Sequence, residues 1–507
     1  MADHVPPFAP ESTRRRFLQS GALALGGMAF SALQPRGGGD GPRARPHVPR
    51  ARNVIYLHME GAPSPLDMFD PKPELQKHDG KKCPDAFLQK ERFAFIRGTP
   101  KLLGSPYKFA KQGQCGAEIS ELLPFTSKIV DDLAIVKSCV TDAFNHAPAE
   151  LFINSGLARV GRPSMGSWLT YGLGTENRDL PGFVVMLSGG GQPSGGCSCW
   201  SSGFLPTVHQ GVPLRSAGDP VLFVRNPEGV SAETRRRSLD ALRDLNQQRL
   251  EAVGDPEIAT RIASYELAYR MQSSVPELMD FAGEKPETLA MYGVEKGKPS
   301  FAANCLLARR LVERGVRFVQ IYSGGAHNDD NWDAHTDMVR NHGKHAGNTD
   351  KPIAGLLKDL KARGLLDSTL VVWGGEFGRQ PTAEYATGTG RDHNPYGFTM
   401  WMAGGGVRGG QVIGSTDRLG ESPKDRPIRP GDIHATMFHS LGIDPKTTFA
   451  DHSGRRPNRN HQVREASRLI LHARPRLPSA EVSGTLPFNK WPYHHPPCYS
   501  GRFPHLT

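Results

Sequence analysis

The chain has 507 residues and a formal net charge of +11, and it contains 57 glycines and 42 prolines. This length suffices for a large α/β core in one domain or two, and the many glycines and prolines indicate long loops. The charge is concentrated at the ends, +5 in residues 1–52 and +7 in residues 445–507, which leaves −1 for residues 53–444. A body this close to neutral excludes an extensive basic surface for DNA or RNA, so we expect no nucleic-acid partner.

The basic N-terminal segment resembles a signal for export by the twin-arginine (Tat) pathway. Residues 13–19 read TRRRFLQ, and a weakly apolar, glycine-rich run follows over residues 21–33. The run is too short and too rich in small residues for a membrane span. We therefore expect residues 1–52 to form a Tat-type signal and linker, with the Tat translocase as a partner during export and a periplasmic or cell-surface destination. The alternative is a basic leader without a role in export.

The folded body is predicted to begin with a buried strand over Asn53–Met59, which reads NVIYLHM and leads into Glu60. Short apolar, β-branched runs without alternation are typical of strands that are buried on both faces. A carboxylate directly after the first strand is a candidate metal ligand. In the alternative interpretation, the turn that follows serves only to cap the next segment through Ser64 and Asp67.

A second strand is predicted over residues 133–139, and a helix follows over residues 149–154. The elbow between them carries Thr141, Asn145 and His146. Because the amides at the start of a helix point at anions, we expect a nucleophile or an oxyanion contact here and take these three residues as catalytic candidates. For Asn145 an ordinary helix N-cap is the alternative.

Helices dominate the middle of the chain. A pair of long helices with leucines at helical spacing is predicted over about residues 233–284, as an insertion that covers the α/β body. A further strand is predicted over residues 182–187, and further helices over residues 302–314, 353–363 and 432–441.

Two more predicted strands organise the candidate site. They cover residues 318–322 and 369–373, and each is followed at once by acids and imidazoles. Because ligands bind off the carboxyl ends of strands in an open α/β sheet, we expect these side chains to converge. Carboxylates and imidazoles without a thiolate suit Zn²⁺, Mn²⁺ or a harder divalent ion, and solvated polar loops are the alternative. The residues are His327, Asp333 and His335 after the first strand, and Glu376, Asp392 and His393 after the second.

Several longer motifs together resemble the DUF1501 family, which is abundant in planctomycete-type bacteria and belongs to the alkaline phosphatase/sulfatase-like superfamily. They include NVIYLHMEGAPSPLDMFDPKPEL, NHAPAELFINSG, GRPSMGSWLTYGLG, NWDAH, LVVWGGEFGRQP and GRDHNPYGFTMWMAGGGVRGG, in this order over about residues 53–444. The resemblance implies an α/β fold with an alkaline-phosphatase-like mixed central sheet sandwiched between helices. It also implies two divalent metals that are bridged by the oxyanion of the substrate.

The resemblance implies roles for individual residues as well. By position, Asp333 and His335 of NWDAH resemble ligands of one metal, which His393 of GRDH completes. Glu376 stands where relatives carry an Asp-His pair, and Glu60 stands where the first-strand aspartate is expected. We therefore expect one or two divalent ions, Zn, Mn or Ca.

The predicted activity is metal-dependent hydrolysis of phosphate or sulfate esters by an exported protein, on a small-molecule or polysaccharide ester. A bound ion would lower the pKa of a water molecule and neutralise charge on the transferring group. His327 or His146 would move protons, since both imidazoles titrate near neutrality. Arg379 and Arg391 would clamp the oxyanion, with surface salt bridges as the alternative.

Two other functions stay open. Phe377 occupies the place of the histidine that relatives carry, and the chain has no serine, threonine or formylglycine nucleophile motif. These departures favour a catalytically inactive superfamily member that binds acidic polysaccharide. A cell-surface structural protein is the other alternative.

The C-terminal tail, residues 445–507, is basic and rich in proline, with little apolar periodicity. This composition predicts disorder. A basic arm that binds anionic surface polymers and a frameshifted end of the gene are the alternatives.

Overall fold

The computed structural model describes residues 48–84, 99–215, 219–221, 225–325, 330–385 and 388–444. Contacts divide the chain into two units, residues 1–472 and 473–507. Every described residue belongs to the first unit. The expected signal, His327 and the tail from residue 445 lie outside the described residues.

A mixed eight-stranded sheet forms the centre of the fold, in the order β12-β4-β11-β8-β1-β7-β5-β6. All of its strands run in one direction except β11, which pairs antiparallel with both β4 and β8. The expected α/β class with a mixed central sheet is thereby confirmed. The strands are β1 (Asn53–Met59), β4 (Ala134–Cys139), β5 (Phe183–Leu187), β6 (Val212–Pro213), β7 (Phe318–Ser323), β8 (Thr369–Gly374), β11 (Phe398–Ala403) and β12 (Gln411–Ile413).

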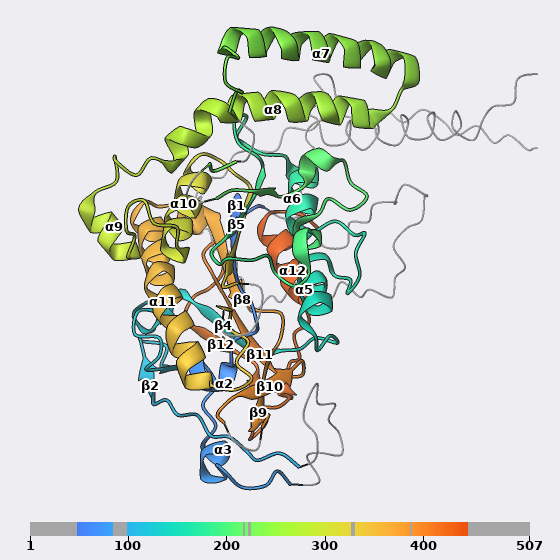
Figure 1. The fold of residues 1–507 in the computed structure, drawn as a ribbon. Coiled ribbons are helices and arrows are strands. Elements are labelled where there is room, and N and C mark those ends of the chain that lie inside the picture. The colour runs from blue at the N-terminus through green and yellow to red at the C-terminus, as the bar shows by residue number, and fades with distance from the viewer. Residues whose placement is uncertain are drawn as a thin grey trace, which may run out of the picture. The chain divides into compact units, whose positions relative to one another are not determined.

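Helices cover both faces of this sheet (Figure 1). Strand β1 shows why, because all seven of its residues are buried and successive side chains point to opposite faces. Ile55 and Leu57 join the apolar core that includes α10 (Phe301–Glu313) and α11 (Met338–Ala362), whereas Val54 and Tyr56 join the core on the other face. The helices of that second core are α5 (His146–Ser155), α6 (Met165–Leu173) and α12 (Pro430–Ser440).

Two long helices, α7 (Ala232–Val253) and α8 (Pro256–Met279), occupy the stretch where the helical insertion is expected. Helix α7 ends at Gly254, whose φ of 71° is the left-handed conformation that a glycine adopts without strain. Asp255 then caps α8 by accepting a hydrogen bond from the backbone N–H of Glu257 at 3.0 Å. The two helices therefore form a hairpin, which is followed by α9 (Pro286–Tyr292).

Helix α11 begins at Met338, well before the start predicted at residue 353. Its N-cap, Asp337, accepts a hydrogen bond from the backbone N–H of Arg340 at 3.1 Å. The first half buries His342 and His345 along with Met338 and Ala346, so most of the inward face of this half reads as polar in the sequence. That pattern explains why hydrophobic periodicity located only the second half.

The remaining elements are short. They are the helices α2 (Pro65–Met68) and α3 (Pro73–Lys77), the two-stranded pairs β2 (Phe109–Gln112) with β3 (Ala117–Ser120), β9 (Gly378–Ala383) with β10 (Arg391–Asn394), and β13 (Ser415–Thr416) with β14 (Pro423–Asp425), and the 3₁₀ turns η1 (Thr126–Asp132), η2 (Gly196–Trp200), η3 (Thr207–His209) and η5 (Leu366–Ser368). Within the described part of the chain, no helix has the length and apolar character needed to cross a membrane.

Candidate metal centre

The predicted site residues lie off the carboxyl ends of the parallel strands. Glu60 follows β1, His146 opens α5 after β4, Asp333 and His335 follow β7, and Glu376 follows β8. Because these strands are parallel, their ends meet at one edge of the sheet. The β9–β10 hairpin reaches the same edge, since β10 precedes β11, the one strand that runs in the opposite direction.

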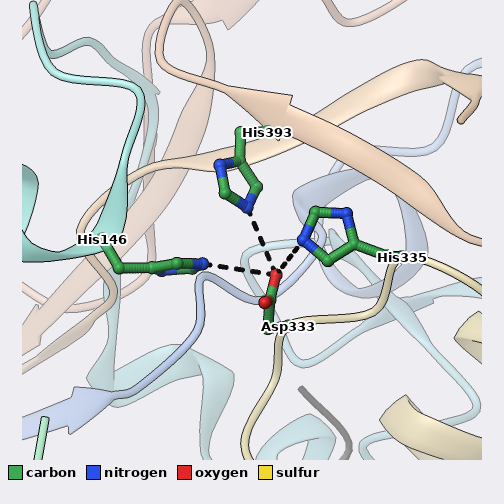
Figure 2. A group of neighbouring side chains, drawn as sticks. All are labelled: His146, Asp333, His335 and His393. Carbon is green, nitrogen blue, oxygen red and sulfur yellow. Dashed lines mark hydrogen bonds and ion pairs between the residues drawn. The ribbon is translucent and has the colours of Figure 1, made fainter. Parts of the chain in front are cut away.

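Three imidazoles converge on one carboxylate in the group that we call the three-histidine site, made of His146, Asp333, His335 and His393 (Figure 2). The Oδ1 atom of Asp333 lies 2.7 Å from Nε2 of His335 and 3.3 Å from Nε2 of both His146 and His393. Asp333 and His393 are buried, whereas the side chains of His146 and His335 keep 17% and 16% of their surface exposed. The site is therefore packed on one side and accessible on another.

The second nitrogen of each ring, Nδ1, contacts an acceptor that lies outside the three-histidine site. Nδ1 contacts Oε1 of Glu376 at 2.7 Å in His146, Oε2 of Glu384 in His335, and the carbonyl oxygen of Phe144 at 2.7 Å in His393. Carboxylates and carbonyls that receive the Nδ1 proton leave Nε2 as the nitrogen that can bind a metal. This arrangement of outer partners is typical of metal-ligating histidines.

The proton balance at His393 indicates what belongs between these rings. Burial lowers the pKa of His393 to about 3, so the ring is neutral near pH 7. A carbonyl oxygen only accepts, so the single proton sits on Nδ1, where it is donated to Phe144. Its Nε2 is directed at Oδ1 of Asp333, 3.3 Å away. A neutral imidazole nitrogen beside a carboxylate oxygen is a pair of atoms that can bind one cation together.

The carboxylate of Asp333 also affects the pKa values of the other two histidines. Burial disfavours the charged ring of His146, but hydrogen bonds to Asp333 and Glu376 raise its pKa to about 9. For His335 burial is likewise outweighed, and Asp333 and Glu384 raise its pKa. Burial raises the pKa of Asp333, but the Arg379 guanidinium and the three histidines together hold it well below its usual range.

Arg379 positions Asp333 rather than facing outward. Its guanidinium is fully buried and contacts Oδ1 of Asp333 at 2.5 Å, while Nε donates to the carbonyl of Ala62 at 2.9 Å. A further donor goes to the carbonyl of Gly61. The turn at Gly61 and Ala62 has φ values of 91° and 60°, and a Cβ on Gly61 would come within 2.5 Å of the Asn331 side chain. Only glycine therefore allows this close approach of the β1 end to the segment before Asp333.

Arg391 is also fully buried and engaged. All five of its N–H groups have protein acceptors: the two oxygens of Asp67 and the carbonyls of Leu103, Gly104 and Gln380. The oxyanion contact predicted for Arg379 and Arg391 is therefore not supported. The sequence alone does not reveal which groups accept hydrogen bonds from Arg379 and Arg391. These acceptors come from residues 61–67, 103–104, 333, 380 and 391.

The other predicted residues are distributed around the site. Asp392 lies in a group with His335 and Glu384 that overlaps the three-histidine site at His335, and the ligand atoms of this group are within 4.8 Å of one another. Asn145 is the exposed N-cap position of α5 without a side-chain cap bond, and Thr141 is buried and accepts from the backbone N–H of Ala143 at 3.4 Å. His146, predicted to move protons, lies among the candidate ligands instead.

Glu60 and Glu376 meet in a second group, the buried acidic cluster, together with His58 and Glu150. Nε2 of His58 lies 3.4 Å from Oε2 of Glu376 and 3.6 Å from Oε2 of Glu60. Burial and the neighbouring carboxylates Glu150 and Glu376 raise the pKa of Glu60 well above its usual range. Burial opposes ionisation of Glu376 too, but His146 and His58 lower its pKa to about 2.

Three residues of these groups were missed by sequence reasoning. His58 lies inside the apolar run of β1, and Glu384 follows β9, a strand that the sequence did not predict. Glu150 follows His146 by four residues on α5, so helical spacing places both on one face. That spacing was the available signal.

Comparison with protein families finds one match. Residues 51–467 match the model of a family described as "Protein of unknown function (DUF1501)". The match covers most of the chain and runs beyond residue 444, where the sequence motifs end. No curated protein matches the sequence.

Solved structures with a similar arrangement include phosphatases and sulfatases. The alkaline phosphatase from the Antarctic bacterium TAB5 is 10% identical with a TM-score of 0.27, covering 73% of this chain and 96% of that one. The PsFucS1 sulfatase from Pseudoalteromonas sp. is 11% identical with a TM-score of 0.30, covering 85% and 72%. Ps i-CgsB in complex with k-i-k-neocarrahexaose is 9% identical with a TM-score of 0.34, covering 82% and 74%. Likeness this distant carries no argument about chemistry, which rests on the site itself.

Proposed function

Because the chain belongs to the DUF1501 family, whose description assigns no activity, we propose from its site that it is a metal-dependent hydrolase of phosphate or sulfate esters. The observation that carries the proposal is the convergence of three Nε2 atoms and one carboxylate oxygen in the three-histidine site. Imidazole nitrogens and a carboxylate are a ligand set that suits Zn²⁺ or Mn²⁺. Oδ1 of Asp333 lies 2.7 to 3.3 Å from the three Nε2 atoms, and the four ligand atoms all lie within 4.8 Å of one another, where the expected spacing is about 3.3 Å around an ion with bonds of about 2.0 Å.

Some of these residues would bind the ion, and others hold the ligand side chains in position. His146, His335, His393 and Asp333 would bind the ion, which when bound would lower the pKa of a water molecule and offset charge on the ester. The acceptors on each Nδ1 fix which nitrogen faces the ion. Phe377, 1% exposed, packs its ring 5.0 Å from that of His146 and 4.5 Å from that of His393. Phe377 thus orients two rings of the three-histidine site.

The nucleophile in this proposal is water rather than a side chain. The hydroxyl of Ser64 donates to Asp67 at 2.5 Å, and that of Thr141 accepts from the backbone, so both have structural partners. His146 and His335 are partly exposed, which provides a face of the site where an ester and a water molecule can approach. Export through the Tat pathway and action outside the cytoplasm belong to the same proposal.

A second candidate function is binding of an acidic polysaccharide without hydrolysis. The observation that weighs against hydrolysis is the full engagement of Arg391 and the near-complete engagement of Arg379 by protein acceptors. Without a guanidinium on the substrate, stabilisation of a transition state would depend on the ion alone.

Hydrolysis of p-nitrophenyl phosphate, bis(p-nitrophenyl) phosphate and p-nitrophenyl sulfate tests the proposal, with chelator-treated protein reloaded with Zn²⁺, Mn²⁺ or Ca²⁺. We expect one ion to restore activity, and His335→Ala to lower it by about 100-fold or more. His78→Ala, which changes an exposed histidine after α3, is the matched control. An ion that binds without any turnover favours the polysaccharide-binding function, and equal ion content in wild type and His335→Ala contradicts the metal site.

A further inference from the structure

A groove with a volume of about 160 Å³ lies between the α2–α3 segment and β2, and none of its lining residues belongs to the three-histidine site. Leu66 and Leu75 form buried parts of its wall, and the partly exposed ring of Phe109 forms another. This volume suits a single six-membered ring, since an apolar cavity of about 150 Å³ accepts benzene. The shape of the groove therefore favours one small cyclic group.

Polar side chains line the same groove, among them Lys72, Ser105 and Tyr107. Nζ of Lys72 lies 3.1 Å from Oδ2 of Asp70 and 3.5 Å from the carbonyl oxygen of Thr416, and an ammonium group has three N–H bonds to donate. Oγ of Ser105 accepts from the backbone N–H of Tyr107 at 3.4 Å, which leaves its own proton for another acceptor. A ligand in the groove can therefore contact a cation and a hydroxyl as well as apolar carbon.

The segments that line the groove are basic. Residues 71–82 and 99–112 carry seven lysines and two acids, a net charge of +5, whereas the net charge of the whole body, residues 53–444, is −1. The two segments pair at the bridge between Lys82 and Lys101, so their lysines lie in one region of the molecule. This concentration of positive charge attracts an anionic ligand.

A short series of contacts connects the groove with the three-histidine site. Leu66 in the wall of the groove precedes Asp67, whose two oxygens accept from Arg391. The carbonyl of Arg391 accepts from Arg379, which contacts Asp333. Figure 1 shows α2 at the same end of the sheet as β9 and β10. The groove therefore lies beside the candidate metal centre.

We propose that this groove binds one anionic sugar ring of a polysaccharide whose ester group is placed at the three-histidine site. Leu66, Leu75 and Phe109 contact the C–H face of the sugar ring. Lys72 attracts its carboxylate or sulfate group, and Ser105 donates to one of its hydroxyls. The proposal deepens the proposed function and rests on it for the position of the ester, but binding in the groove does not require hydrolysis.

Electrophoresis of the full chain in native gels that contain a polysaccharide tests the groove. Dextran sulfate and polygalacturonate supply the two anionic groups, and unmodified dextran is the neutral polymer. We expect at least one anionic polymer to retard the wild type and dextran not to retard it. Phe109→Ala leaves the net charge unchanged and is expected to raise the dissociation constant about 10-fold, because the sugar loses an aromatic contact. Tyr265→Ala, which removes an exposed ring on α8, is the control and keeps the wild-type value.

Lys72→Gln is a second variant, which removes the cation from the groove. Asp70 keeps Lys137 at 3.5 Å as an ion-pair partner, so the fold should tolerate this change. We expect the dissociation constant for the anionic polymer to rise about 10-fold, since a charged contact is lost. Lys298→Gln removes the same charge from a side chain that is 72% exposed, and is expected to have a smaller effect.

The outcomes separate the groove from the hydrolase. Equal retardation of wild type, Phe109→Ala and Lys72→Gln overturns the groove, and the hydrolysis assay still decides on the proposed function. Weaker retardation of both variants without hydrolysis by the wild type supports the groove and overturns the hydrolase. Retardation by dextran equal to that by dextran sulfate, or by no polymer at all, overturns the anionic sugar. A wild-type dimer that Phe109→Ala converts to a monomer in sedimentation also overturns it, because a second copy of the chain then fills the groove.

Discussion

Each histidine of the three-histidine site depends on a residue that never faces the site. Glu376, Glu384 and the carbonyl of Phe144 each accept the Nδ1 proton, and so determine which nitrogen faces Asp333. The same holds for Asp333, which Arg379 keeps ionised and oriented. The chemistry of the site is therefore sensitive to residues that would not contact a substrate.

Loss of one such partner gives the first prediction. Glu384→Ala removes the acceptor of His335 and is expected to weaken metal binding by about 10–100-fold, because the ring is no longer held in its ligating tautomer. The dissociation constant is measured by competition with a chromophoric chelator. Glu118→Ala serves as the exposed control, and an unchanged constant in Glu384→Ala would contradict the role given to this carboxylate.

The Asp67–Arg391 pair gives a prediction about stability and pH. Asp67 is fully buried; burial raises its pKa, but Arg391 and Ser64 outweigh this and lower the pKa below the ordinary value of an aspartate. A lowered folded-state pKa means that Asp67 contributes stability above its unfolded pKa, and that this contribution is lost as the pH falls through the folded pKa.

Asp67→Asn should therefore lower the free energy of unfolding at pH 7 by about 3–5 kcal/mol, since Arg391 is left as a buried charge without its partner. Urea unfolding at pH 7 and at pH 3 measures this, and the difference between wild type and variant should shrink at the lower pH. If Asp67→Asn lowers the free energy of unfolding equally at pH 7 and at pH 3, the Asp67–Arg391 pair is not the cause of the loss.

At the scale of elements, the parallel strands bring the site together and the helices support it from behind. The sequence predicted β1, β4, β5, β7 and β8 because each is a short apolar run, and it placed the polar residues at their ends. Convergence of Asp333, His335 and His393 follows from that topology. Glu376 reaches them only through His146, which hydrophobic patterning alone does not reveal.

The rest of the site could not be predicted because its partners are distant in sequence. Arg379 and Arg391 lie more than 300 residues from the Gly61–Asp67 segment whose oxygens they bind. His58 sits within an apolar strand, where a lone histidine is unremarkable. The polar half of α11 hides its buried face in the same way, since His342 and His345 carry no apolar signal.

The α7–α8 hairpin is attached to the body through α8, which contacts η3 near its start and α10 near its end. Leu278 is fully buried in the core that contains α10, whereas Leu245 on α7 is 62% exposed. We expect Leu278→Ala to lower the free energy of unfolding by about 2–5 kcal/mol and Leu245→Ala to change it by less than about 0.5 kcal/mol. Equal losses of unfolding free energy for Leu278→Ala and Leu245→Ala in chemical denaturation would contradict this expectation.

At the scale of the whole molecule, the net positive charge lies in segments of the sequence that contain none of the candidate site residues. The body of the chain is near neutral, and the excess of arginine lies in the two terminal segments. A separate role for the N-terminal segment is consistent with this division, because the predicted site needs none of its residues.

Replacement of the twin arginines tests that role in the full chain. Arg14→Lys with Arg15→Lys is expected to abolish export, and Arg43→Lys, in the linker, to leave it unchanged. Cell fractionation followed by immunoblotting gives the distribution between compartments. Unaltered export of the double variant would rule out the Tat assignment.

The central claim is that the four residues of the three-histidine site hold a metal ion, and anomalous X-ray scattering tests it most directly. Crystals of the full chain grown with Zn²⁺ or Mn²⁺, with data collected on both sides of the metal absorption edge, locate the ion independently of activity. The account predicts an anomalous peak about 2.0–2.2 Å from Nε2 of His146, His335 and His393 and from a carboxylate oxygen of Asp333. A fully loaded crystal with no peak among these four side chains would contradict it.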